Sequence, residues 1–232
     1  NLYGNVRTSL IGQAANARQS QIFNALPGIL PTDLGPTANI SGTSAQLRAL
    51  GQIPPVADPD IETTLGPPPG IGFNSNFNFD FDPTDGIDTE KTDFEAVAIH
   101  ELGHALGFVS GVGNRESAPS TALLAPTVWD IFRFRPGGLN DGAFATGNRV
   151  QIAGGSQVYF VGEAELPLST ATSGGAGGDG RQSSHWKDNA LIGDYTGVMD
   201  PTAASGERLT ITFNDLTALS FMGYKINPDV TV

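Results

Sequence analysis

The sequence predicts a single α+β domain over residues 1–232, and three patterns support this fold class. Residues 71–81 alternate apolar and polar side chains, as a half-buried strand does. Residues 93–107 form an amphipathic pattern behind a capping signal, and a second helical pattern closes the chain. We expect an upper subdomain (1–107) with a small twisted mixed sheet, a backing helix and the helix 93–107. An irregular lower subdomain (108–232) should end in a helix, with a cleft between the two.

The composition limits the classes of partner. The chain has 24 acidic and 12 basic side chains, a formal net charge of -12, which argues against binding to nucleic acid or anionic membranes. It has no cysteine, so disulfides and cysteine-ligated zinc are excluded. No apolar run approaches the roughly 20 residues of a membrane helix. Because the chain starts at Asn1 with no Met and no signal peptide, we expect a mature or trimmed chain. We also expect a monomer that is secreted to the extracellular space or periplasm.

Two helices are expected before the alternating stretch. Apolar residues recur at spacings of three and four from Leu2 to Leu26, and Pro27 and Gly28 follow. Ala45 to Leu50 has the pattern of a short helix, with Thr43 or Ser41 as its cap and Gly51 as its end. The Pro-rich, acidic residues 52–70 predict a loop.

The alternating stretch 71–81 is a candidate for the upper rim of the cleft, a position that the family resemblance described below implies. Its free edge could pair with an extended peptide by strand addition, although an ordinary internal strand would show the same pattern. The substrate cleft would then include residues of this rim, namely Phe73, Asn74, Ser75 and Asn76. Four aspartates follow closely, Asp80, Asp82, Asp85 and Asp88. They suggest Ca²⁺ as a weaker interpretation, because their spacing does not match an EF-hand and solvated turn residues would look the same.

The helix 93–107 is expected to begin at a capping box and to end at a glycine. Thr92 supplies the hydroxyl and Glu95 the acidic side chain three residues later. Gly107 permits the left-handed turn that redirects the chain.

The second half has fewer regular patterns. Residues 128–134 fit a short strand or a helical turn, and residues 150–152 and 158–161 fit a hairpin around Gly154 and Gly155. Residues 213–222 form the final helical pattern, between Thr212 as cap and Gly223 as stop.

The helix 93–107 contains the motif HELGH, which is the strongest chemical signal of the chain. His100 and His104 are four residues apart and lie on one helix face, so both can bind one metal ion. Glu101 is placed to act as general base on a water bound to that metal. A catalytic zinc site usually has three protein ligands. Because the chain has only three histidines, His185 is the leading candidate for the third.

The wider motif resembles the metzincin clan of zinc endopeptidases. HELGHALG, His100 to Gly107, continues to a later histidine and a methionine turn around Met199. Most metzincins place the third histidine three residues after the glycine, but this chain has Ser110 there. The long segment before His185 is similar to the leishmanolysin-like branch, in which an insertion separates the glycine from the third ligand. The resemblance covers residues 94–222 and indicates a bacterial-type relative.

The resemblance implies a metzincin-like zincin, a secreted metalloprotease that hydrolyses peptide bonds of extracellular proteins with Zn²⁺ as cofactor. Its substrate would be a protein or peptide. Glu101 would take a proton from the water and pass it to the leaving amine. Met199 would form the Met-turn, an apolar floor beneath the metal. Thr202 and Ala203 would line the primed side of the substrate cleft.

Two other interpretations stay open from the residues alone. The chain could be a non-catalytic extracellular binding module with a structural zinc, although such a site needs no base at Glu101. It could also be a zincin outside the metzincins, with Glu163 or Glu165 as third ligand, which would leave His185 and Met199 unexplained.

Overall fold

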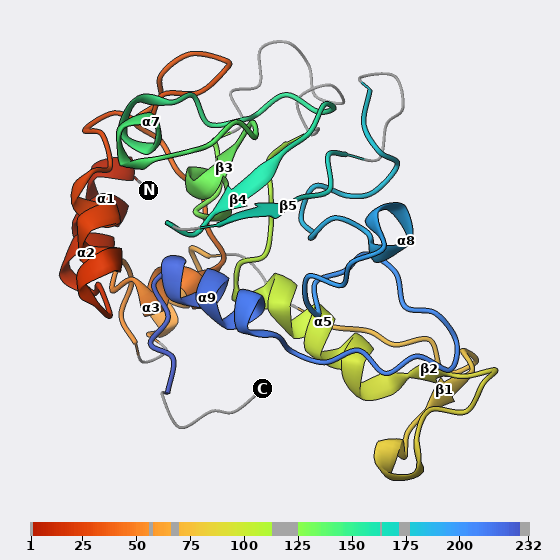
Figure 1. Ribbon diagram of the computed structural model, residues 1–232. Coiled ribbons are helices and arrows are strands. Elements are labelled where there is room, and N and C mark those ends of the chain that lie inside the picture. Colours follow the sequence, from red (N-terminus) through yellow and green to blue (C-terminus); the bar gives the residue numbers. More distant parts are fainter. Residues whose placement is uncertain are drawn as a thin grey trace.

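The computed structural model (Figure 1) describes residues 2–55, 58–65, 70–112, 125–162, 164–171 and 177–227. Its helices are α1 (Tyr3–Gly12), α2 (Ala17–Asn24), α3 (Ser44–Ala49), α4 (Pro59–Glu62), α5 (Phe94–Leu106), α7 (Asp141–Thr146), α8 (Asn189–Ile192) and α9 (Phe213–Phe221), with 3-10 turns η1 (Pro83–Asp85) and η2 (Trp129–Phe132). Its strands are β1 (Phe79–Asp80), β2 (Thr92–Asp93), β3 (Arg133–Phe134), β4 (Val158–Phe160) and β5 (Glu165–Pro167). The mixed content agrees with the predicted α+β class. Within these ranges no helix has the length and apolar character needed to cross a bilayer.

The hydrophobic core draws on both sides of residue 107. Phe23 of α2 lies against Phe132 and against Phe221 of α9, with ring centroids 6.1 and 5.6 Å apart. Trp129 stacks on Tyr159 at 4.2 Å and lies 5.0 Å from Trp186. These rings are buried, so the aromatic core joins the two predicted subdomains and places Trp186, the neighbour of His185, in its centre.

The larger sheet lies in the second half of the chain, and this corrects the predicted position of the sheet in residues 1–107. The antiparallel sheet has the order β3-β4-β5, with Arg133 opposite Tyr159 and Tyr159 opposite Leu166. In the described part of the first half, the named strands are only β1 and β2, which form a parallel pair. Figure 1 shows this pair and η1 on an extension at the start of α5.

The prediction of one helix over residues 2–26 is wrong, because the chain breaks between α1 and α2. Asn16 adopts an extended conformation and its side chain accepts a hydrogen bond from the amide of Gln19, which begins a new helix. Both helices then pack side by side at one edge of the molecule (Figure 1), and each turns apolar residues toward the core.

The predicted strand 71–81 is also wrong, except at Phe79 and Asp80. The side chain of Asn74 accepts from the amide of Asn76, and its carbonyl accepts from the amide of Phe77, so residues 74–77 turn. The phenylalanines meet instead around Phe94, whose ring centroid lies 5.0 Å from Phe73 and 4.8 Å from Phe81. The alternation therefore reflects an aromatic cluster, which leaves Phe81 70% exposed.

The predicted hairpin of residues 150–152 and 158–161 does not form. The amide of Val150 donates to the backbone carbonyl of Arg133, and the amide of Gln151 donates to the carboxylate of Asp33. Strand β4 pairs with β3 and β5 instead. Periodicity alone could not identify these remote partners. Residues 128–134 contain both predicted alternatives, since the helical turn η2 leads directly into β3.

The helices that frame the site follow their local signals closely. Gly107 ends α5 at φ 121°, and α9 has a capping box in which Thr212 and Asp215 each accept from the other's backbone amide. The short helix α3 is capped by the side chain of Thr43 and is followed by Gly51 at φ 67°. The N-cap of α5 lies one residue later than predicted, because the side chain of Asp93, not that of Thr92, accepts a hydrogen bond from the amide of Ala96.

Candidate metal centre

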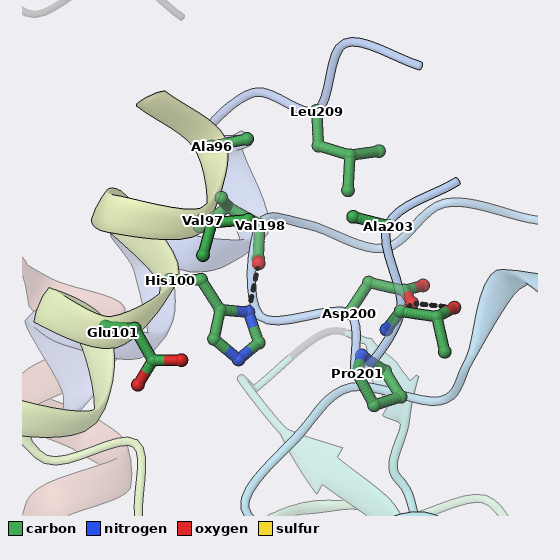
Figure 2. A pocket seen from close by; sticks show the side chains of 10 residues that line it. Ala96, Val97, His100, Glu101, Val198, Asp200, Pro201, Ala203 and Leu209 are labelled. Carbon is green, nitrogen blue, oxygen red and sulfur yellow. Dashed lines mark hydrogen bonds between the residues drawn. The ribbon is translucent and has the colours of Figure 1, made fainter. Parts of the chain in front are cut away.

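Helix α5 presents two histidines and one glutamate on its inner side. His100 and His104 are four residues apart, and their ring centroids lie 4.9 Å from one another. Glu101 lies beside His100, and both face the Pro201 segment in Figure 2. Their relative placement follows from helix geometry, since every residue from Phe94 to Leu106 is helical.

His185 arrives from the opposite side on an irregular segment. Its Nε2 lies 3.0 Å from Nε2 of His100 and 3.2 Å from Nε2 of His104. Among the described residues, these three side chains are the only group of three or more His, Cys, Asp or Glu residues whose ligand atoms could hold one metal ion. The structure thus brings together the three histidines that the sequence singled out.

A backbone carbonyl fixes the orientation of each ring. Nδ1 of His100 lies 2.9 Å from the carbonyl of Val198, Nδ1 of His104 lies 2.6 Å from that of Phe108, and Nδ1 of His185 lies 3.0 Å from that of Gln182. A carbonyl only accepts, so each Nδ1 must carry the hydrogen and each neutral ring keeps its lone pair on Nε2. The three lone pairs therefore point at one place.

The electrostatic environment favours neutral rings. Burial, and then the nearby imidazoles of His104 and His100, lowers the pKa of His185 to about 3. Burial also lowers the pKa of His104. Both rings are therefore uncharged at neutral pH and available as metal ligands.

The arrangement fits zinc. Bonds of about 2.0–2.1 Å at tetrahedral angles place ligand nitrogens about 3.3 Å apart, close to the 3.0 and 3.2 Å between the Nε2 atoms. Without a cation, lone pairs at this separation would repel, because no hydrogen lies between them. Hydrogen bonds from Nδ1 to backbone carbonyls are the usual outer support of zinc-binding histidines. Three imidazoles leave one position of a tetrahedral ion for water or substrate.

Met199 packs against α5 at Gly103, which lies between His100 and His104 in the sequence. It is fully buried, and a methyl group on Gly103 would overlap its sulfur. Gly103 therefore lets the side chain lie directly against the backbone of α5, between the two histidine positions. The Met199 carbonyl accepts from the amide of Trp186, which ties the methionine turn to the segment of His185.

A pocket of about 150 Å³ opens beside His100 and Glu101 (Figure 2). Its wall includes Thr202 and Ala203, the two residues predicted for the primed side. The rest of the lining consists of Ala96, Val97, Val198, Asp200, Pro201 and Leu209. A second hollow of about 510 Å³ shares His100 and Glu101 with it and is also lined by His104, His185 and Gln182.

The other predicted cleft residues do not line either opening. Phe73 packs on Phe94 at the far end of α5, and Asn74, Ser75 and Asn76 belong to the adjoining turn. This stretch lines neither opening because its residues fold back on each other, as they do where the strand was predicted.

The four aspartates do not form a second metal site among the described residues. Asp80 accepts from the amides of Asp82 and Asp88, and these bonds lower its pKa. Asp82 accepts from Thr84, Asp88 pairs with Lys91 at 2.5 Å, and Asp85 belongs to η1. These side chains stabilise turns, and we do not propose calcium.

The alternative glutamate ligands have other positions. Glu165 accepts from the backbone amides of Leu139 and Gly137, away from the histidines. Glu163 lies outside the described residues. His185 is therefore the third ligand candidate that the geometry favours.

Sequence reasoning missed the groups that orient the rings and line the pocket. The carbonyls of Val198, Phe108 and Gln182 have no residue signature, since any amino acid supplies one. Val97 could have been found, because it precedes Glu101 by one turn of the same helix. Leu209 lines the pocket from a remote irregular segment and carried no signal.

Comparison with protein-family models, with curated proteins and with solved structures gave no match to this chain. The case for a function therefore rests on the site itself.

Proposed function

We propose that this protein is a zinc-dependent endopeptidase of the metzincin type, acting on extracellular proteins after secretion. The observation that carries the proposal is the convergence of three Nε2 atoms beside Glu101. The glycine turn at Gly107 and the buried Met199 support the metzincin assignment, as does a third histidine that lies far beyond the glycine in the sequence.

His100, His104 and His185 would hold the ion. When bound, zinc supplies Lewis-acid activation of a water molecule and of the scissile carbonyl. The carboxylate of Glu101 takes a proton from the attacking water and delivers it to the leaving amine nitrogen. It lines the same two openings as His100, so it is available for this exchange.

The pocket beside Glu101 supports a polypeptide substrate. Its apolar wall includes Val97, Val198 and Leu209, and Asp200 and Thr202 add polar groups to the lining. Such a wall would accept an apolar side chain adjacent to the scissile bond and thereby orient that bond.

The test compares Glu101→Gln with His185→Ala in a zinc-binding assay and in cleavage of a denatured protein. Glu101→Gln should keep zinc and lower the cleavage rate by at least about 100-fold, because only the proton transfer is removed. His185→Ala should lose both zinc and cleavage.

Glu95→Gln is the matched control. Glu95 lies on the same helix, pairs with Arg208 at 3.0 Å and does not line the pocket. It should retain full cleavage. Wild-type rates in Glu101→Gln would refute the peptidase mechanism. Full zinc content in His185→Ala would refute the assignment of His185 as the third zinc ligand.

A further inference from the structure

The third histidine depends on a turn with no regular structure of its own. Nδ1 of His185 is oriented by the carbonyl of Gln182, so the ring can point correctly only if residues 182–185 keep their shape. These residues belong to no helix or strand. Their geometry must be imposed by neighbouring segments.

The buried guanidinium of Arg133 contacts this turn directly. Arg133 is fully buried at the start of β3. Its Nη2 donates to the carbonyl of Ser183, inside the turn, and its Nη1 donates to the carbonyl of Ser169 at 3.2 Å. The amide of Ser169 in turn donates to the carbonyl of His185. The side chain of Arg133 thus contacts the turn directly at Ser183, and it also binds Ser169, whose amide contacts His185.

Asp130 connects the same guanidinium to the chain that leaves α5. One carboxylate oxygen accepts from Nε of Arg133 at 3.2 Å and from the hydroxyl of Ser110 at 2.6 Å. The other accepts from the amide of Gly111 at 2.9 Å. Ser110 lies two residues beyond Phe108, whose carbonyl orients His104. The amide of Ser110 also donates to the hydroxyl of Ser184.

A fully buried ion pair is a costly way to stabilise a fold. Its desolvation offsets most of its attraction, so an apolar pair often packs as stably. What the pair supplies is directional hydrogen bonding, because a guanidinium holds several acceptors in one plane. Here one acceptor, the carbonyl of Ser183, lies in the turn of His185, and another, the carboxylate of Asp130, also binds Ser110 and Gly111 in the chain that follows His104.

We propose that Arg133, supported by Asp130, is a positioning residue that sets the geometry of His185 at the metal centre. This inference rests on the proposed zinc site. It does not depend on peptidase activity.

The test uses Arg133→Lys and, as its matched control, Arg149→Lys. Arg149 is equally buried and also donates to backbone carbonyls, those of Ile131 and Gly147. None of its hydrogen bonds among the described residues reaches the turn 182–185. Each metal-free variant is titrated with Zn²⁺ against a chelator and with Co²⁺, whose visible absorption reports ligand geometry. Urea unfolding measures stability.

Arg133→Lys should bind Zn²⁺ about 10- to 100-fold more weakly, the range found for residues that orient metal ligands, and should change the Co²⁺ spectrum. Arg149→Lys should lose stability without either change. Wild-type affinity and spectrum in Arg133→Lys would overturn the proposal, and so would equal weakening in Arg149→Lys.

A second variant covers the case in which Arg133→Lys does not fold. The pair Asp130→Leu with Arg133→Met removes both charges, so neither is left unpaired, and it should show the same weakening. Wild-type affinity there would overturn the proposal. Tight zinc binding by a wild-type protein that cleaves no denatured protein would refute the peptidase function and leave the positioning role standing. Failure of the wild-type protein to bind either metal would overturn both.

Discussion

Helix α5 and the turn 182–185 bring ligands to one metal centre by opposite means. The helix fixes His100 and His104 through local hydrogen bonds, its Asp93 cap and the Gly107 stop. The turn has no regular structure and is shaped by groups distant in sequence, such as Arg133 and Ser169. Both nevertheless orient their rings through a carbonyl on Nδ1.

This difference predicts which substitutions would displace a metal ligand. A helix can be altered at its surface and still present residues four apart on one face. An irregular turn has no such rule, and a change in any of its supports moves the ligand. We expect α5 to be most sensitive where it contacts something remote, and the segment of His185 to be sensitive to its charged partners.

Gly103→Ala should have the largest effect on the helix side, because Gly103 is where α5 depends on a remote residue. The added methyl would overlap the sulfur of the buried Met199. Alanine normally improves a helix by about 1 kcal/mol over glycine, but overpacking costs about 1–3 kcal/mol. We expect a net loss in the free energy of unfolding, measured with urea on the metal-free protein.

Gly4→Ala is the control for this prediction. A methyl at Gly4, in α1, would meet no other atom within 4 Å, so this variant should be neutral or more stable. A Gly103→Ala protein at least as stable as wild type would show that Met199 can move aside, and that α5 is as self-contained as its sequence suggests.

Asp93→Ala should have an intermediate effect, of about 1 kcal/mol, because it removes the cap of α5. The carboxylate accepts from the amide of Ala96 at 3.1 Å. Thr92→Ala should cost less, since Thr92 makes no cap hydrogen bond to this helix. Zinc affinity should change little in either variant, because His100 lies well within the helix. A larger loss in the free energy of unfolding for Thr92→Ala than for Asp93→Ala would indicate that Thr92 is the cap, as predicted from the sequence.

The same difference between α5 and the turn 182–185 explains which parts of the fold and of the site could be predicted from the sequence. The limits of α5 and α9 follow from caps and glycines a few residues away, and both helices were predicted within a residue or two. His185 was found by elimination, because the chain has only three histidines. The ion pair of Asp130 and Arg133 had no signature, since its partners are mostly backbone carbonyls and amides. The alternation of residues 71–81 misled because a strand requires a partner strand, and these phenylalanines pack on Phe94 instead.

The smallest predicted effect concerns pH and the charged groups that flank His185. Burial would raise the pKa of Asp188, but hydrogen bonds from Arg181, the amide of Ala190 and Thr202 outweigh burial and lower it. The folded pKa thus lies below the unfolded value of about 3.9. The unfolded chain binds more protons in that window, so this stabilisation is present above about pH 4 and is lost as the pH falls through the folded pKa.

The metal-free protein should therefore lose stability between about pH 5 and pH 3 more steeply than its Asp188→Asn variant. The difference should stay below about 1 kcal/mol, because Arg181 is 38% exposed and water screens the pair. Urea midpoints across this range measure it. In an Arg181→Gln background the same substitution should have a smaller effect, since the charge partner is gone. Identical pH dependence in wild type and Asp188→Asn would mean that the ionised carboxylate of Asp188 does not stabilise the segment of His185. The two halves of the metal centre would then differ in regularity but not in the kind of force that fixes them.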